Sequence, residues 1–172
     1  MTRSCLANLL VRLETPGDQP AIHRIVAQAF GQDPEGRLVD HLRANGKFVL
    51  SLVAVLDGEL VGHILHTDMI GTDQRLAGLA PLSVLPAVQR QGIGSALINE
   101  SLGYLREQGY DGVVVLGHPD YYRRFGFHAA SGFGIHTQFD VPAEYLMALD
   151  LTGTGLNPCQ VRYQPEFESL VP

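Results

Sequence analysis

The sequence predicts a mixed α/β fold in one domain, 1–172, in which an antiparallel meander precedes a β-α-β crossover. Asp57-Gly58 stands between two apolar runs and is a strong β-hairpin signal. Residues 113–116 form an unbroken apolar run, as expected of a strand that is covered on both faces. A helix-like run precedes that strand and another strand-like run precedes the helix. A strand, a helix and a strand in this order imply parallel pairing through a right-handed crossover. The length suits a single domain with a real core.

Two helices are expected between a first strand and the hairpin. Residues 8–14 have the composition of a strand. Asp18 is a suitable N-cap, and Pro20 falls in the first turn of the helix that follows. A shorter helix is expected from about residue 35 to residue 44, with Gly46 as its stop signal.

Three apolar segments predict the meander. Residues 48–56, 60–67 and 76–85 are rich in β-branched and aliphatic side chains. A glycine-containing turn at 89–94 leads from them into a helix at 95–108, whose apolar residues keep helical spacing. The remaining expected elements are a short helix at 120–124, two closing strands at 133–139 and 145–151, and a last strand at 160–163.

The charge limits the kinds of ligand. The formal net charge is -6 at pH 7, which argues against a nucleic-acid surface and is weakly compatible with a cationic or amine substrate. An anionic cofactor therefore needs local positive potential. Arg90, Arg123, Arg124 and the start of helix 95–108 are the available sources.

The chain shows no targeting or membrane signal. No apolar run approaches the roughly 20 residues that span a bilayer, and the N-terminus lacks the basic start and apolar core of a signal peptide. The expected location is therefore the cytoplasm, without a membrane partner. Cys5 and Cys159 have no metal-ligand spacing around them, so reduced thiols are expected, with a terminal disulfide as the alternative.

The turn at 89–94, with the sequence QRQGIG, is the most informative stretch. Its two glycines, Gly92 and Gly94, carry no Cβ, so the backbone can come close to a ligand. The first N–H groups of the following helix have no partner inside it and carry the positive end of the helix dipole. This arrangement suits a phosphate or pyrophosphate. The alternative is a turn that only lets the helix pack closely on the strand.

Two well-known phosphate-binding motifs do not match this turn. A P-loop needs Lys and then Ser or Thr directly after its last glycine, but Ser95 and Ala96 follow Gly94. A dinucleotide-binding fingerprint needs a third glycine where Leu97 stands, and a βαβ unit where the meander lies.

Pro81 conflicts with its surroundings, because it lies inside an apolar run typical of a central strand. Its nitrogen has no hydrogen to donate to a neighbouring strand, so a bulge or a splayed strand edge is expected there. A splay directly before the glycine turn would leave free backbone groups beside the phosphate site. A pantetheine arm joined to a pyrophosphate has the shape to pair with them.

Two motifs resemble the GNAT superfamily of N-acetyltransferases. Its signature Arg/Gln-x-x-Gly-x-Gly/Ala, after a strand and at a helix start, is matched by Gln89-x-x-Gly92-x-Gly94. An aromatic-rich short helix of the form Tyr-x-x-x-Gly-Phe is matched by the run from Tyr122 to Phe127. The order of strands and helices agrees with the family from about residue 8 to residue 139. The resemblance implies the GNAT fold with splayed central strands.

The segment from Gly117 to Tyr122 narrows the resemblance. Together with the C-terminal segment it is similar to a bacterial subgroup of the family whose substrates are mostly unassigned. Many members have an Asn near the start of the short helix, where Gly117-His118-Pro119 stands in this chain.

The resemblance also implies acetyl-CoA as the cosubstrate, without a metal. The backbone of Leu82, Ser83 and Val84 would pair with the pantetheine arm, and residues 89–95 would wrap the pyrophosphate, mainly through N–H groups. The implied cofactor-binding residues are Leu82, Ser83, Val84, Gln89, Arg90, Gln91, Gly92, Ile93, Gly94 and Ser95.

Tyr122 falls where the family often has a general acid. Acetyl transfer from a thioester needs a neutral amine, a stabilised oxyanion and a protonated leaving thiolate. The backbone N–H of Val84 is the expected oxyanion donor. The phenol of Tyr122 holds its proton at neutral pH and can protonate the thiolate. The alternative is a ring that only caps the core, with Tyr121 as the substitute acid.

The general base stays open among His63, His66, His118, Glu144 and a chain of water molecules. His63 and His66 lie three apart on one predicted strand, so their side chains are expected on opposite faces of the sheet. For that reason, and for want of a third ligand, they are poor metal ligands as a pair.

The expected function is acetyl-CoA-dependent transfer to a primary amine of a small molecule or peptide. A non-catalytic acyl-CoA-binding or regulatory domain on the same fold is the first alternative, and a nucleotide-binding oxidoreductase is the second. Residues 18–45 and the C-terminal segment are expected to line the acceptor side. The acceptor, the strictness for acetyl and the choice between monomer and homodimer stay open.

Overall fold

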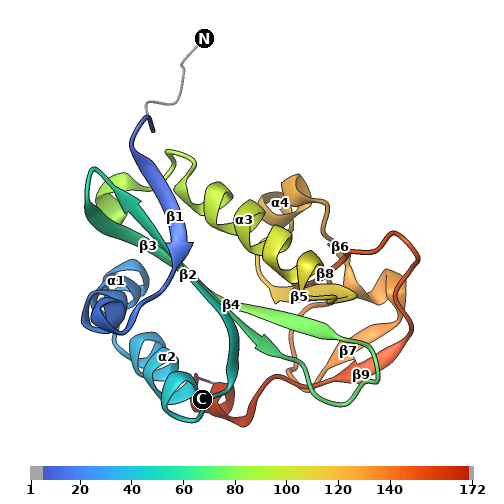
Figure 1. Ribbon diagram of the computed structural model, residues 1–172. Coiled ribbons are helices and arrows are strands. Elements are labelled where there is room, and N and C mark those ends of the chain that lie inside the picture. Colours follow the sequence, from blue (N-terminus) through green and yellow to red (C-terminus); the bar gives the residue numbers. More distant parts are fainter. Residues whose placement is uncertain (1–5, 171–172) are drawn as a thin grey trace.

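The computed structural model describes residues 6–170, and Cys5 lies outside them. Its centre is a seven-stranded sheet with the order β1-β2-β3-β4-β5-β8-β6 (Figure 1). The strands of this sheet are β1 (Leu9–Leu13), β2 (Phe48–Leu56), β3 (Glu59–Asp68), β4 (Leu76–Val84), β5 (Gly112–Leu116), β6 (His128–Ala129) and β8 (Leu146–Asp150). A separate parallel pair consists of β7 (Ile135–Thr137) and β9 (Cys159–Val161).

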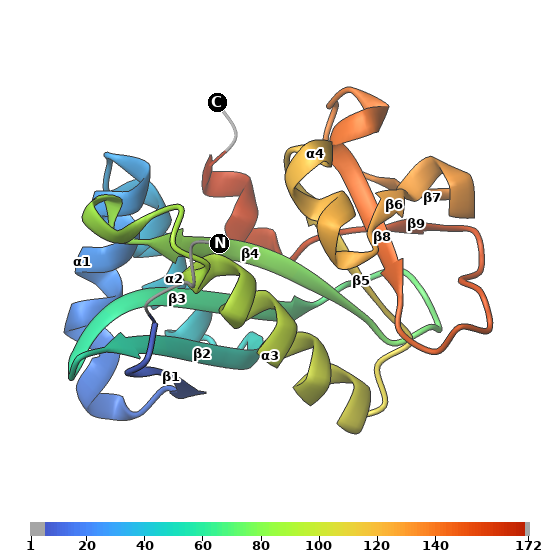
Figure 2. The same cartoon turned by 90° about the horizontal axis from the view of Figure 1, so that it is seen from above.

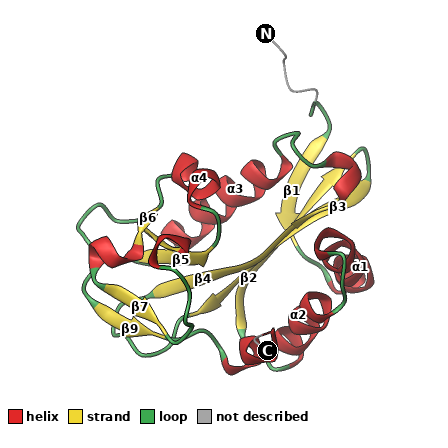
Figure 3. Cartoon of the chain, turned by 180° about the vertical axis from the view of Figure 1, so that it is seen from behind, coloured by secondary structure: helices red, strands yellow, loops and turns green. Residues whose placement is uncertain are grey.

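Helices cover both faces of the main sheet. The helices α1 (Gln19–Phe30) and α2 (Pro34–Ala44) lie on one face and α3 (Ile93–Glu107) lies on the other (Figure 3). A short helix, α4 (Pro119–Tyr122), follows β5, and a 3-10 helix (Pro165–Leu170) contacts α2. Figure 2 shows α4 and the strands β6 to β9 at one end of the sheet, with α1 and α2 at the other.

The core consists of two apolar clusters that the sheet separates. Leu52 of β2 packs in the cluster that includes Leu97 of α3, whereas Val53 packs in the cluster that includes Ile22 of α1. Successive strand residues point to opposite faces, so an unbroken apolar strand can fill both clusters.

The predicted meander and crossover are confirmed. β2 and β3 pair antiparallel, as do β3 and β4, while β4 pairs parallel with β5 after the crossover through α3. Asp57 and Gly58 both have positive φ angles, 51° and 84°, as a tight two-residue hairpin turn requires.

Asp18 occupies the N-cap position of α1, but its carboxylate does not cap that helix. It accepts hydrogen bonds from Arg12 at 2.7 Å and from the backbone N–H of Thr15 at 2.7 Å. The bond from Arg12 is the main reason why the pKa of Asp18 falls to about 2. Asp18 therefore connects the end of β1 to the start of α1 through an ion pair.

One prediction for the C-terminal third is wrong. Residues 145–151 contain β8, which joins the main sheet beside β5, but residues 133–139 do not close that sheet. Only Ile135–Thr137 is a strand there, and it pairs with β9. The other side of β8 is already taken by β6, whose two residues pair with Met147 and Ala148.

Candidate active site

The central strands separate where Pro81 predicts. β4 pairs with β5 only over Leu76–Leu79. Two residues of β4, Ala80 and Pro81, then stand opposite a single residue of β3, Leu65. This is a β-bulge, and from it onward β4 remains paired with β3 alone. The second half of β4 therefore has an open backbone edge inside the sheet.

The direction of the backbone groups along this edge can be assigned. The N–H of Leu85 donates to the carbonyl of Val61 on β3, at 2.8 Å. Backbone groups alternate in direction along a strand, so those of Ser83 also face β3, and those of Leu82 and Val84 face the open edge. Two of the three residues implied to pair with pantetheine thus have the required orientation, and Ser83 does not.

The glycine turn opens into a hollow of about 480 Å³ at the start of α3. Gly92 is the N-cap of α3 with φ 89°, a conformation that favours glycine. The side-chain amide of Gln89 donates to the carbonyl of Val84 at 3.0 Å and so connects the turn to the open edge of β4. Every residue of 89–95 except Gln91 lines the hollow. The first turn of a helix that faces such a hollow suits an anion.

Arg123 and Arg124 differ in position. Arg124 lines the same hollow, and its guanidinium lies over the ring of Tyr121, 4.7 Å from the ring centre. Arg123 does not line it and approaches Asp120 at 3.9 Å on the surface. Arg90 and Arg124 are therefore the side chains that give this hollow its positive charge.

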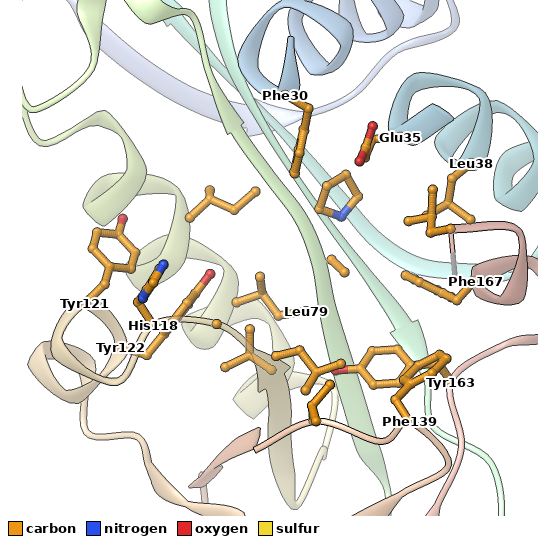
Figure 4. A pocket seen from close by; sticks show the side chains of 18 of the residues that line it. Phe30, Glu35, Leu38, Leu79, His118, Tyr121, Tyr122, Phe139, Tyr163 and Phe167 are labelled. Carbon is orange, nitrogen blue, oxygen red and sulfur yellow. The ribbon is translucent and has the colours of Figure 1, made fainter. Parts of the chain in front are cut away.

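A second cavity, of about 650 Å³, lies at the splay itself (Figure 4). Its lining includes Leu79 and Tyr122 from the core cluster on the α3 face and Leu38, Tyr163 and Phe167 from the cluster on the opposite face. The cavity therefore connects the two faces of the sheet. We call it the splay cavity.

Two residues join the splay cavity to the hollow. Leu82 and Tyr121 line both of them. A Cβ added to Gly94 would lie 2.6 Å from the Tyr121 hydroxyl, so this hydroxyl sits directly against the first turn of α3. One extended ligand can therefore run from the hollow, along the edge of β4 and past Tyr121, into the splay cavity.

Tyr122 is buried, with 8% of its surface exposed, and it lines the splay cavity. Burial raises the pKa of its hydroxyl, and the neighbouring Tyr121 adds to that rise. Edge-to-face contacts with Tyr121 and Phe127, at centre distances of 5.0 and 5.6 Å, fix the ring. The phenol therefore keeps its proton throughout the neutral range.

The strand histidines do not reach either space. His63 stands opposite Val53 and His66 opposite Leu50, which places their side chains on opposite faces, as predicted. Both are fully buried, and desolvation lowers the pKa of each to about 3. The hydroxyl of Ser51 and Nε2 of His63 lie 2.9 Å apart. Neither histidine lines the splay cavity or the hollow.

The other two side chains predicted as possible bases, His118 and Glu144, differ in their position relative to the splay cavity. His118 lines the splay cavity, whereas Glu144 is exposed and lies outside both linings. Glu35, in the first turn of α2, is a further site residue that was not predicted individually from the sequence. It lines the splay cavity on the side of α1 and α2 (Figure 4). The expectation that residues 18–45 line this side was the only sequence signal for it.

Residues 6–170 contain neither a metal-binding cluster nor a membrane-spanning helix. In this part of the chain, no group of three or more His, Cys, Asp or Glu side chains is placed to hold a metal ion. None of its helices combines the length and the apolar character needed to cross a bilayer.

Residues 17–133 match the model of the acetyltransferase (GNAT) family. The chain belongs to this family. It is 40% identical to the uncharacterized N-acetyltransferase YhbS of Escherichia coli K12 over 126 residues, which cover 72% of this chain and 75% of YhbS. It therefore has the GNAT fold and is a member of a family of N-acetyltransferases.

Two solved GNAT structures extend the similarity over most of the chain. The structure of E. coli YhbS in complex with CoA has 31% sequence identity and a TM-score of 0.87, and the match covers 93% of this chain and 92% of that one. A GNAT acetyltransferase from Brucella melitensis in complex with acetyl-CoA has 36% identity and a TM-score of 0.79, over 93% of this chain and 98% of that one.

Proposed function

We propose that this GNAT protein transfers the acetyl group of acetyl-CoA directly to a primary amine, with the reacting atoms in the splay cavity. The observation that carries the proposal is the continuous path from the hollow at Gly92 and Gly94, along the open edge of β4, to Tyr122. Two GNAT relatives of similar fold form complexes with CoA and acetyl-CoA, which supports this donor.

The donor fits this path by its chemistry. The pyrophosphate lies in the hollow, where the N–H groups at the start of α3 and the side chains of Arg90 and Arg124 offset its charge. The amides of pantetheine pair with the outward-facing carbonyl of Leu82 and the N–H of Val84, as an added strand would. The carbonyl of Val84 accepts the amide of Gln89, and the N–H of Val84 is the open donor of this residue.

The thioester then lies beside Leu82, where the hollow and the splay cavity meet. The N–H of Leu82 is placed to stabilise the oxyanion, because it faces the open edge at this junction. Val84, the donor expected from sequence, lines the hollow but not the splay cavity, so it lies on the pyrophosphate side of the junction.

An ammonium group loses one proton to become the nucleophile, and its lone pair forms the bond to the carbonyl carbon. The bond between that carbon and sulfur breaks, and the thiolate takes a proton from Tyr122. The nitrogen loses a second proton, which restores the tyrosine, so one proton is released for each acetyl group transferred.

The proposal is tested with purified protein, acetyl-CoA and a panel of amines, by following both thiol release and the mass of the product. The expected result is thiol release that depends on an amine, together with a product that is heavier by one acetyl group. Acetyl-CoA binding without any acetylated product would contradict the proposal and favour a non-catalytic acyl-CoA-binding domain. The same assay with propionyl-CoA in place of acetyl-CoA measures how strictly the site selects the acetyl group.

A further inference from the structure

The wall of the splay cavity away from Tyr122 is built almost entirely of apolar side chains. Helices α1 and α2 contribute Phe30 and Leu38, and the C-terminal third contributes Phe139, Val141, Phe167 and Leu170. The thioester enters the cavity beside Tyr121 and Leu82, which also line the hollow. This apolar wall is therefore where an acceptor rests, and burial of apolar acceptor surface against it stabilises the complex.

The charged residues of the lining have one sign. Glu35 and Asp140 are the only carboxylates in the lining as described, and it contains one imidazole, His118, but no Lys or Arg. An anionic group inside the cavity would lose its hydration shell and meet carboxylates in place of a counter-ion. The cavity therefore discriminates against acceptors that carry a carboxylate or a phosphate.

Glu35 has an unused hydrogen-bonding atom. Its Oε1 accepts the side-chain amide of Gln32 at 2.7 Å, whereas its Oε2 is buried and has no partner among the described residues. A buried carboxylate oxygen without a donor is costly, and an ammonium group offers three donors together with the opposite charge. Figure 4 shows Glu35 next to Phe30, so the carboxylate stands at the edge of the apolar wall.

We infer that the acceptor is a primary amine on an aromatic or branched aliphatic body without an anionic group, and that Glu35 binds its ammonium group. This inference rests on the proposed transfer to an amine and adds the class of acceptor. The apolar wall selects the body, the missing basic residues exclude anionic acceptors, and Glu35 selects the amine.

A set of matched compounds tests the class. 2-Phenylethylamine is compared with phenylalanine, which adds a carboxylate, and with ethylamine, which lacks the apolar body. We expect kcat/KM to fall at least ~10-fold for each, as unpaired buried charge and lost apolar burial each weaken binding by about that factor or more. Equal or better use of phenylalanine, or of the polar polyamine spermidine, would overturn the inference.

Glu35→Gln tests the residue. The KM for 2-phenylethylamine is expected to rise about 10-fold, while the Kd of acetyl-CoA stays unchanged. The control is Glu100→Gln, which changes an exposed glutamate of α3 outside both linings and leaves both values as they are. An unchanged KM in Glu35→Gln would contradict the role of Glu35.

Failure of the proposed transfer can be recognised separately. If acetyl-CoA binds but no amine is acetylated, the proposal of acetyl transfer is wrong. The acceptor class is then tested by amine binding alone. Saturation-transfer NMR with the CoA-loaded protein ranks the same compounds without any turnover. Binding of 2-phenylethylamine that is lost with phenylalanine and weakened by Glu35→Gln supports the inference, and the opposite order overturns it.

Discussion

Gly117 and the ring of Tyr122 fit together so closely that position 117 has no room for a side chain. A Cβ on Gly117 would overlap Cε2 of Tyr122 and lie 2.8 Å from its Cδ2. The N–H of Gly117 donates to the carbonyl of Tyr145 at 2.9 Å, which holds the end of β5 in place. The main chain after β5 thus forms one wall against which the phenol is positioned in the splay cavity.

Gly117→Ala is therefore expected to displace the ring of Tyr122. Because the methyl group meets the ring and not a flexible chain end, we expect kcat to fall at least ~10-fold, at an unchanged Kd for acetyl-CoA. Steady-state kinetics and isothermal titration calorimetry give the two values. Gly103→Ala is the matched control, since a Cβ there meets nothing within 4 Å and alanine suits the middle of α3. A fully active Gly117→Ala variant would show that the position of the phenol does not matter.

The two neighbouring arginines are expected to differ in their effect on the donor. Arg124 lines the hollow and Arg123 does not, so Arg124→Ala should weaken acetyl-CoA binding roughly fivefold, while Arg123→Ala leaves it within error. Titration calorimetry at low and high salt measures this, and salt should reduce the difference between the two variants. Equal losses would mean that only the overall charge of the surface counts.

His23 connects α1 to α2 through two carboxylates. Its Nδ1 lies 2.6 Å from Asp40 and its Nε2 lies 2.7 Å from Asp33. The bond to Asp40 and then the bond to Asp33 raise the pKa of His23 above its usual value of 6.5. Phe30 ends α1 and Glu35 lies in the first turn of α2, so these two contacts of His23 support one wall of the splay cavity.

A histidine whose pKa is higher in the folded protein than in the unfolded chain stabilises the fold. This stabilisation is complete below the pKa of the unfolded chain, and it is lost as the pH rises through the pKa of the folded protein. The stability advantage of the wild type over His23→Asn should therefore shrink between about pH 6 and pH 9. Urea unfolding at both pH values measures it, with His136→Asn, an exposed histidine, as the control. An advantage that grows with pH would contradict the assignment.

His66 is expected to be dispensable for catalysis. Neither of its ring nitrogens has a hydrogen-bond partner among residues 6–170, and its pKa of about 3 leaves it neutral. Because the unfolded chain binds the proton more readily, the histidine lowers stability as the pH falls from about 6.5 toward 3. His66→Leu should therefore stabilise the protein at about pH 5 by roughly 1 kcal/mol or more, with unchanged kcat.

His63→Leu is the informative comparison for this variant. It also removes a titrating ring, but it leaves the hydroxyl of Ser51 without its partner, so the gain in stability should be smaller. Urea unfolding and steady-state kinetics measure both variants. Loss of acetyl transfer in His66→Leu at unchanged acetyl-CoA affinity would show that His66 carries a proton during the reaction.

The fold was predictable where a local pattern leaves one solution. Asp57-Gly58 determines a hairpin through its backbone angles, and the proline at position 81 excludes regular pairing, which led to the bulge. The error at residues 133–139 arose because strand pairing is decided by competition for an edge. β6, only two residues long, takes the place beside β8, and no local pattern marks so short a strand.

The site was predictable to the same extent. The donor side is built from one continuous stretch, 82–95, so its spacing carries the information. The acceptor side gathers Phe30, Glu35, Phe139 and Phe167 from segments far apart in the chain, and each of these alone resembles an ordinary core or surface residue. Only the tertiary structure brings them together around one cavity.

The most direct test of the account is acetyl transfer by Tyr122→Phe, measured together with the affinity for acetyl-CoA. The central claim predicts a loss of about 100-fold or more in kcat, because the thiolate loses its proton donor, while the Kd of acetyl-CoA stays within about twofold. Tyr145→Phe, at an exposed ring outside the cavity lining, should keep full activity. Unchanged kcat in Tyr122→Phe would contradict the claim that this phenol protonates the leaving thiolate.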